Sequence, residues 1–400
     1  MKGIRIEKLF GRFDYEIELK PGGMTILTGP NGFGKSTIIR CIEAISNSDL
    51  DYFFELDFEE IEILGDEQPN LLIQKKADAL IVCGYAIDRR INAYRKRAIL
   101  RRADEELVDE GIDRMMVSYR SIIELMQQSI GKVVYIEEQR LLQERESALR
   151  ASNGTRRIGK QLVHTVESIP RKLQIKMHKV SSEYSSVANE LDSTYPERLF
   201  NQADGIGEEE FDPKMDVMME KFEKLNKYGV SNIKKLQDIK FKQEDARALK
   251  VYFDDFDKKY AKYEPLIEEL DLFTEMVNRR FLFKHLEISA ETGTRVVDDS
   301  GREISLLKLS SGEKETLVLF YQLLFEVPDG VLLLVDEPEI SLHVKWQRMF
   351  AEDLHKIVSR KNINVIVATH SAQIVNGNRR IQIDLGEMYK NGLNKGKSGV

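Results

Sequence analysis

The nine residues GPNGFGKST, at positions 29–37, constrain the fold of this chain more than any other stretch. They follow the apolar run MTILT, precede the helix-like run IIRCI and fit the spacing of the phosphate-binding loop G-x-x-x-x-G-K-[ST]. Glycines allow backbone N–H groups to face an anion, Lys35 reaches the terminal phosphates, and the Ser36 hydroxyl can ligate Mg²⁺. The alternative is a structural glycine turn, but a strand before the loop and a helix after it favour phosphate binding.

A second segment supplies the carboxylates that a phosphate loop needs for its metal. Residues 331–343, VLLLVDEPEISLH, have the pattern of a buried strand that ends in two acids. Asp336 is placed to hold Mg²⁺, directly or through water, and Glu337 to polarise the attacking water. The alternative is a core strand that merely ends in acidic residues, and the phosphate loop elsewhere in the chain makes the metal site the better interpretation.

Composition narrows the class of protein. The 400 residues suggest two or three domain-sized units, and 42% hydrophobic residues are ample for a core. A net charge of -7 restricts any nucleic-acid contact to a local patch. The only cysteines, Cys41 and Cys83, cannot build a disulfide framework, no apolar run approaches the ~20 residues of a membrane span, and the N-terminus lacks a signal-peptide core. We therefore expect a soluble cytoplasmic protein.

The two ends of the chain are rich in β-type patterns. Residues 1–42 predict short strands, the phosphate loop and a helix, residues 52–87 alternate as in a β-meander, and a small hairpin set is expected from residue 286. Basic residues crowd positions 88–102, which we interpret as a solvated helix face, with a phosphate-contacting patch as the alternative. The polar, glycine-rich tail from residue 388 is expected to be loose.

The middle of the chain has a helical pattern. Apolar residues recur every three or four positions at 177–191, between Pro170 and Pro196, and again at 249–270. Such seams require partner helices, so an antiparallel helical hairpin or bundle is predicted for residues 166–285. Pro265 is expected to kink or break the last helix.

The segment LSSGEKE, residues 309–315, resembles the signature of the ABC-type ATPases. In that family a serine and a glycine at a helix start contact the γ-phosphate of a nucleotide held by the opposite subunit, and Ser310 and Gly312 match those positions. Gln139, after the strand-like KVVYI, resembles the Q-loop glutamine, and His370 in VIVATHS resembles the H-loop histidine. Five elements therefore occur in the family's order over roughly residues 1–140 and 286–385. They are the phosphate loop, the Q-loop-like Gln139, the signature-like segment, the strand that ends in Asp336 and Glu337, and the H-loop-like His370.

The resemblance implies an α/β fold: an ABC-ATPase head of the P-loop class, with a mixed sheet, a β-meander subdomain and a short helical or coiled-coil insertion. It implies ATP and Mg²⁺ as cofactors and a homo-oligomer, either a dimer or a ring of dimers, in which two protomers sandwich each nucleotide. The implied catalytic residues are Glu337, Lys35, His370 and Gln139, and the implied metal ligands are Ser36, Asp336 and Gln139. The implied nucleotide contacts are Asn31, Gly32, Gly34, Lys35, Ser36, Thr37, Arg12, Ser310 and Gly312.

Two departures from the transporter pattern point to a branch of the family. His343 stands where many members carry the D-loop aspartate, as in the RecF and OLD branch, and the adenine-stacking tyrosine of transporters is not evident. The segment FGRFDY, residues 10–15, instead resembles the Rad50-like heads, in which an arginine near this point approaches the phosphates. Arg12 is the candidate for that role.

Spacing indicates the subgroup and the domain organisation. The separation between Ser36 and Leu309 is too long for a transporter subunit and too short for a long-rod SMC or Rad50 protein, so the chain resembles the OLD-like ATPases, including subunits of the anti-phage systems Septu and PARIS. The segment after His370 is too short for the nuclease domain of OLD proteins. Three segments are predicted: an N-terminal head part at 1–165, the helical insertion at 166–285 and a C-terminal head part at 286–400.

These observations lead to one leading hypothesis and two alternatives. The leading hypothesis is an ATP-hydrolysing sensor and scaffold of an anti-phage complex, with a separate effector nuclease, a phage or nucleic-acid trigger and no membrane partner. The first alternative is a RecF- or RecN-like DNA-maintenance ATPase that binds DNA through the basic stretch. The second is a nucleotide-gated binding module with negligible turnover.

Overall fold

The computed structural model describes residues 1–65, 70–77, 79–89, 110–150, 156–231, 240–340 and 342–397. Its internal contacts divide the chain into two compact units, residues 1–139 with 326–400, and residues 140–325. These boundaries differ from the predicted ones at 165 and 285. The reason is that short strands on either side of the central helices, and the helix that begins at residue 311, pack against those helices rather than standing apart.

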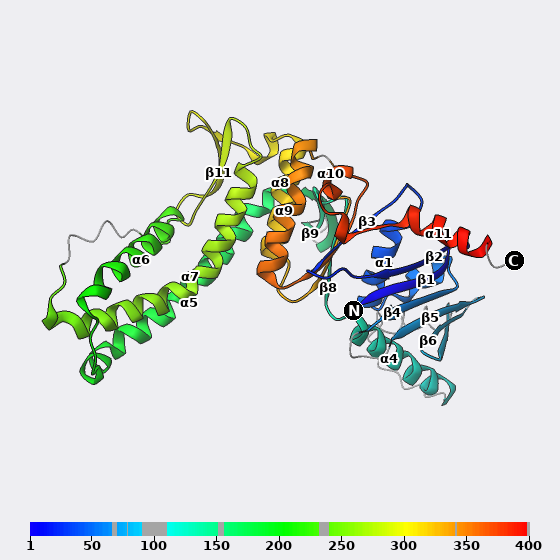
Figure 1. The fold of residues 1–400 in the computed structure, drawn as a ribbon, viewed down its shortest axis with the longest axis horizontal. Helices are drawn as coiled ribbons and strands as arrows, with labels where there is room; N and C mark the ends of the chain where they lie inside the picture. The colour runs from blue at the N-terminus through cyan, green and yellow to red at the C-terminus, as the bar shows by residue number, and fades with distance from the viewer. Residues whose placement is uncertain are drawn as a thin grey trace. The chain divides into compact units, whose positions relative to one another are not determined.

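A five-stranded parallel sheet forms the centre of the first unit (Figure 1). Every residue of the strands that precede the phosphate loop and Glu337 is buried, as expected for a parallel sheet covered on both faces. Because parallel strands end at the same edge, the segments after them emerge together. The order is β16 (Gln382–Asp384), β3 (Met24–Thr28), β15 (Asn364–Ala368), β14 (Leu332–Asp336) and β8 (Val133–Ile136).

An antiparallel sheet is the second layer of this unit and confirms the predicted meander from residue 60 onward. The strand expected near residue 52 is wrong, because Leu50–Glu55 form helix α2. Leu50, Phe53 and Phe54 recur at helical spacing and are all buried, which gives this segment one apolar helical face. The strand order is β2 (Phe13–Glu18), β1 (Gly3–Leu9), β4 (Glu60–Leu64), β5 (Leu71–Lys76), β6 (Ala79–Val82) and β7 (Tyr85–Asp88).

The C-terminal tail differs from its prediction. Residues Leu385–Lys397 form helix α11 instead of a loose segment. Asp384 Oδ1 accepts hydrogen bonds from the backbone N–H of Gly386, at 2.8 Å, and of Glu387, at 3.1 Å, and so caps the helix start. Tyr389 packs edge-on against Phe13, with ring centroids 5.1 Å apart. The cap and the aromatic contact explain why this segment is a helix.

The first unit also contains the helices α1 (Lys35–Ser46), α4 (Glu110–Ile130), α9 (Val344–Lys361) and α10 (Ala372–Val375).

Three long helices dominate the second unit and confirm the predicted helical hairpin. Helices α5 (Thr165–Asn201) and α7 (Ala246–Asn278) run side by side, with Tyr184 and Tyr263 ring centroids 5.0 Å apart (Figure 1). Helix α6 (Glu208–Lys227) also packs on α7. The apolar seams seen in the sequence are therefore packing surfaces between these helices.

Proline does not end these helices. A break at Pro265 is wrong, since α7 continues through it, whereas the alternative of a kink there stays a prediction, and α5 contains both Pro170 and Pro196. A proline inside a helix removes one backbone hydrogen bond. Tyr263 and Leu266 on either side of Pro265 are buried, so tertiary packing holds the helix across the missing bond.

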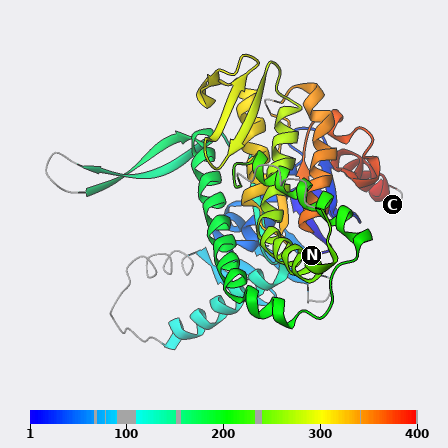
Figure 2. The ribbon, with the colours of Figure 1, turned by 90° about the vertical axis from the view of Figure 1, so that its left-hand side faces the viewer.

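Shorter elements complete the second unit. An antiparallel ribbon of β9 (Leu142–Arg150) and β10 (Arg156–His164) leads directly into α5 (Figure 2). The predicted hairpin set is present as β11 (Lys284–Ser289), β12 (Gly293–Asp298) and β13 (Glu303–Ile304), and it is followed by α8 (Ser311–Tyr321).

Two predictions concern surfaces rather than the core. Within the part of the chain that the structure describes, no helix has both the length and the apolar character that a membrane span requires. Of the basic stretch at 88–102, only Asp88 and Arg89 are among the described residues. Arg89 NH2 donates a hydrogen bond to the carbonyl of Phe54 at 2.8 Å, whereas the remainder of the predicted basic patch lies outside the described residues.

Candidate active site

The phosphate loop connects β3 to α1 through backbone conformations that require glycine. Gly29, Gly32 and Gly34 have φ values of 146°, 81° and 82°, in the region that L side chains rarely adopt. At Gly34 a Cβ would also lie 2.8 Å from Leu9 Cδ2. The strand, loop and helix predicted from the sequence are thus present, with α1 beginning at Lys35.

The other loop residues differ in exposure. Asn31 and Gly32 are exposed at the tip, whereas Ser36 and Thr37 are half-buried in the first turn of α1. The first backbone N–H groups of a helix have no partner within the helix. The start of α1 therefore offers the loop the donors and the positive helix end that suit an anion.

Lys35 is turned inward onto its own loop. Its side chain is almost fully enclosed, with 4% of the residue exposed. Nζ lies 3.1 Å from the Gly29 carbonyl oxygen and 2.6 Å from His370 Nε2. Burial lowers the pKa of Lys35, and the nearby Glu337 and Asp336 carboxyl groups oppose that shift. The ammonium is held by oxygen and nitrogen acceptors that a phosphate oxygen could replace.

Asp336 ends β14 directly opposite Ser36. The Ser36 hydroxyl donates to Asp336 Oδ1 at 3.0 Å, and the Tyr135 hydroxyl donates to Oδ2 at 3.1 Å. Oxygen ligands about 2.1 Å from Mg²⁺ in an octahedral shell lie about 3 Å from their neighbours, so the spacing of Ser36 Oγ and Asp336 Oδ1 fits this ion. Tyr135 was not predicted from the sequence, although a polar residue near the end of a predicted strand could have indicated it.

Glu337 has a strained backbone and a perturbed carboxyl group. Its φ is 44°, and its N–H donates to the Ala368 carbonyl at 2.9 Å, which ties β14 to β15. Oε1 lies 3.1 Å from His370 Nε2. Burial first, and Glu339 second, raise the pKa of Glu337 to about 8, while Lys35 lowers it. Perturbed carboxyl groups in such settings are typical of acid–base sites.

His370 lies between the loop lysine and the strand-end acid. Burial lowers its pKa, as does the Lys35 ammonium, so the neutral ring can accept a hydrogen bond from Lys35. The backbone around His370 is bound by Glu339, whose Oε1 accepts hydrogen bonds from Thr369 Oγ1 and from the N–H groups of His370 and Ser371. Glu339 was not among the predicted site residues, although it stands two residues after Glu337 in the same acidic motif.

Two predicted contacts are not seen in this state. Gln139 is exposed three residues beyond the end of β8, and no described hydrogen bond joins it to Ser36 or Asp336. Arg12 is exposed in the turn between β1 and β2, with its guanidinium carbon 5.9 Å from the Phe13 ring centroid. Their predicted roles at a metal and a phosphate remain predictions.

The signature segment belongs to the second unit and starts a helix, as its resemblance implied. Ser310 caps α8 through a capping box: its Oγ accepts from Glu313 N at 3.4 Å, and its N–H donates to Glu313 Oε2 at 2.9 Å. Lys284 Nζ lies 3.0 Å from Glu313 Oε1. Gly312 accepts a hydrogen bond from Thr316 Oγ1 at 2.8 Å, so Ser310 and Gly312 sit in a well-defined helix start.

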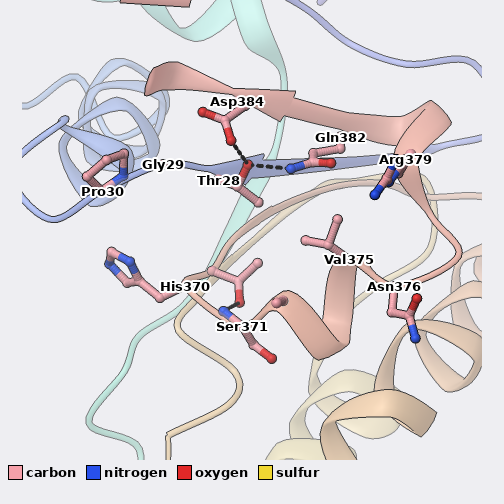
Figure 3. A pocket seen from close by; sticks show the side chains of 12 residues that line it. Thr28, Gly29, Pro30, His370, Ser371, Val375, Asn376, Arg379, Gln382 and Asp384 are labelled. Atoms are coloured by element: carbon pink, nitrogen blue, oxygen red, sulfur yellow. Dashed lines mark hydrogen bonds between the residues drawn. The ribbon is translucent and has the colours of Figure 1, made fainter. Parts of the chain in front are cut away.

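A pocket of about 480 Å³ adjoins the phosphate loop on the side of His370 (Figure 3). One wall is a chain of hydrogen bonds from Gln382 to Thr28, at 2.8 Å, and from Thr28 to Asp384, at 3.3 Å. The opposite wall carries Val375, Asn376 and the residues around His370. The pocket lies outside the carboxyl ends of β3, β15 and β16, where α/β sheets bind their ligands. It is lined by Thr28, Gly29, Pro30, Thr369, His370, Ser371, Ala372, Val375, Asn376, Arg379, Gln382 and Asp384.

The fold and the site define a class of protein. A parallel sheet that carries a phosphate loop after one strand and an Asp–Glu pair after another, interrupted by a helical hairpin, is the α/β head of an ABC-type ATPase with a coiled-coil insertion. Residues 2–375 match the AAA ATPase domain family, so the chain belongs to that family and is an ATPase of this general type.

Comparison with curated proteins and with solved structures gives the following results. No curated protein gives a significant match. The Smc head domain of Pyrococcus furiosus, with an extended coiled coil and bound to the C-terminal domain of ScpA, aligns at 12% identity and a TM-score of 0.39, covering 94% of this chain and 90% of that one. The SMC head domain of Thermotoga maritima aligns at 12% identity and a TM-score of 0.36, with the same coverage.

Proposed function

We propose that this protein hydrolyses ATP to ADP and phosphate at the site between β3, β14 and β15. One observation carries the proposal: residues from distant parts of the sequence meet at one sheet edge. His370 contacts both Lys35 and Glu337, and Ser36 donates a hydrogen bond to Asp336 beside them. A phosphate loop beside a lysine, a metal-binding acid and a second acid is the set that phosphoryl transfer to water uses.

Each residue has a task that its position supports. Lys35 and the start of α1 hold the phosphates, and Ser36 and Asp336 hold Mg²⁺. Bound Mg–ATP supplies the reactive terminal phosphoryl group and a cation that neutralises charge developing on it. In its ionised form Glu337 takes the proton of the attacking water, whose oxygen bonds to phosphorus while the bond to the ADP oxygen breaks. His370 orients the terminal phosphate and Glu337 through hydrogen bonds.

Two substitutions test this proposal. Lys35→Ala is expected to abolish ATP binding, measured by titration with a fluorescent ATP analogue, because the ammonium is the enclosed cation of the loop. Glu337→Gln is expected to bind ATP as tightly as the wild type while losing at least about 10²-fold in turnover, since the amide cannot take a proton. Equal turnover in the wild type and Glu337→Gln would refute the assignment of the base and favour a nucleotide-gated binding module.

We further propose that two copies share each ATP. Ser310 and Gly312 form a capped helix start in a unit that does not contain the phosphate loop, and the family resemblance gives this segment a role toward the nucleotide of a second protomer. A helix N-terminus suits the negative charge of a terminal phosphate. ATP then holds two heads together, and hydrolysis releases them, so that the protein acts as a switch.

We propose a role in anti-phage defence as the biological setting. Its support is the resemblance of the motif set and its spacing to the ATPase subunits of such systems, in which a separate nuclease is the effector. Purification with the product of a neighbouring gene is the test: association that changes with ATP supports the sensor and scaffold role. If the two proteins do not associate, either with or without ATP, the sensor and scaffold role is excluded.

A DNA-maintenance ATPase is the alternative, and the basic residues at 88–102 favour it. Reversal of the charges of Arg95, Lys96 and Arg97 is expected to abolish salt-sensitive DNA binding if this role is correct. A chain that binds no DNA at low salt would exclude the alternative.

A further inference from the structure

Glu339 joins the segments that follow two neighbouring strands. β14 and β15 pair in parallel, with Asp336 opposite Ala368, and Glu339 lies three residues beyond the first of these ends. One carboxylate oxygen, Oε1, accepts three hydrogen bonds: from Thr369 Oγ1 at 2.6 Å, from His370 N at 2.7 Å and from Ser371 N at 2.9 Å. Bonds to a charged acceptor are among the strongest in proteins.

A second set of contacts braces the same junction. Gln347, on α9, donates from Nε2 to the Leu342 carbonyl at 2.9 Å and accepts from the Ser371 hydroxyl at 2.8 Å. The Ser371 hydroxyl in turn accepts from the backbone N–H of Gln373 at 3.1 Å. Residues 369–371 are therefore bound from two sides, by Glu339 at the backbone N–H groups of His370 and Ser371 and by Gln347 at the Ser371 hydroxyl, and Glu339 is the only charged partner among these contacts.

The position of the His370 ring depends on this bound backbone. The backbone N–H of His370 is one of the three donors, and its ring reaches Lys35 Nζ at 2.6 Å and Glu337 Oε1 at 3.1 Å. A shift of the backbone by a fraction of an ångström would lengthen both contacts at once. Among the described residues Glu339 makes no hydrogen bond to the phosphate loop or to Ser36, but its carboxyl group also lies beside that of Glu337.

We infer that Glu339 is a positioning residue for hydrolysis, which holds the His370 backbone through Oε1 and thereby fixes the His370 ring between Lys35 and Glu337. The inference rests on the proposed ATPase function for its kinetic consequence, but the contact itself can be measured without nucleotide. A carboxylate suits this position because one anionic oxygen can satisfy three converging donors, whereas an amide oxygen accepts more weakly.

Hydrogen exchange in the absence of nucleotide tests the contact directly. In Glu339→Ala the amide protons of His370 and Ser371 are expected to exchange about tenfold faster or more than in the wild type, because both lose a charged acceptor. Glu339→Gln, which keeps an acceptor oxygen, is expected to restore part of the protection. Wild-type exchange at both amides in Glu339→Ala would overturn the inference whatever the enzyme's activity.

Kinetics test the consequence. Glu339→Ala is expected to lower kcat by about 10²-fold, since displacement of a positioned group by 1 Å has effects of this size, while the Kd for ATP stays within about threefold. Glu339→Gln should recover at least tenfold of the lost kcat, and Thr369→Val, which removes one of three donors, should give an intermediate loss. Glu352→Ala, which removes an exposed carboxylate from α9, is the matched control and should behave as the wild type.

The outcomes separate the two proposals. If the wild type neither binds nor hydrolyses ATP, and Lys35→Ala behaves identically, the proposed function fails while the exchange result still stands. If the wild type hydrolyses ATP and Glu339→Ala raises Kd without lowering kcat, the positioning role fails and the proposed function survives.

Discussion

At the scale of single residues, the site concentrates backbone strain and charge at the end of β14. Glu337 adopts a left-handed conformation that a non-glycine residue rarely takes, and its carboxyl group lies among Asp336, Glu339 and Lys35. Such strain persists only where surrounding contacts impose it, here the bond to the Ala368 carbonyl and the contact with His370. The arrangement keeps the Glu337 carboxyl group close to the phosphate loop, where its pKa depends on the charges of Glu339, Asp336 and Lys35.

The raised pKa of Glu337 predicts how stability depends on pH. A carboxyl group whose pKa is higher in the folded than in the unfolded protein binds more protons when folded, so stability declines as the pH rises from the ordinary glutamate range toward pH 8. We expect the urea midpoint of the wild type, in EDTA and without nucleotide, to fall between pH 6 and pH 8. Glu337→Gln should flatten this decline, and an equal decline in both proteins would contradict the assignment.

At the scale of elements, α8 is anchored by a buried ion pair. Arg140 Nε lies 3.3 Å from Glu315 Oε2, and the two side chains are 2% and 7% exposed. Burial raises the pKa of Glu315, and Arg140 opposes that shift. Because Arg140 directly follows Gln139, the pair links the end of the Q-loop-like segment to the helix that Ser310 caps.

Breaking this ion pair from one side should be costly. Glu315→Met is expected to lower the unfolding free energy by about 3–5 kcal/mol, because it removes the carboxylate that lies beside the buried Arg140 charge. The double substitution Arg140→Met with Glu315→Met should cost clearly less than the sum of the two single changes. Urea unfolding monitored by circular dichroism measures all four proteins, and strict additivity would show that the pair does not interact.

At the scale of the whole molecule, the two halves of the proposed site lie in different units of the chain. The phosphate loop, Asp336 and Glu337 belong to the first unit, whereas Ser310 and Gly312 belong to the second. If a second copy completes the proposed site, each chain alone is inactive and hydrolysis is coupled to association.

Mixing two defective proteins tests the shared site. Lys35→Ala removes the phosphate-binding ammonium of the loop. Ser310→Asp keeps a helix-capping side chain but places a negative charge toward a bound phosphate. Each alone is expected to be inactive, whereas an equal mixture should recover about a quarter of wild-type turnover, since half of the dimers are mixed and each contains one intact site. Ser310→Asn, a neutral cap, is the control, and full activity of Ser310→Asp would refute sharing.

Local sequence patterns were sufficient for the parts of this protein whose physics is local. The glycine positions of the loop, the apolar strands that end at Asp336 and before His370, and the helical seams were all predictable, because backbone conformation and hydrophobic period depend on neighbouring residues. The residues of the proposed site could be named for the same reason.

Only the tertiary structure decided how these parts act on one another. Glu339 and Tyr135 were missed because their importance lies in partners far away in the sequence, Ser371 and Asp336. The break at Pro265 and the loose C-terminal tail were wrongly predicted, because packing around Tyr263 and Tyr389 outweighs local propensity. The sequence alone determined which chemistry the chain can carry, and tertiary contacts decided which groups hold that chemistry in place, because such contacts depend on distance in space and not along the chain.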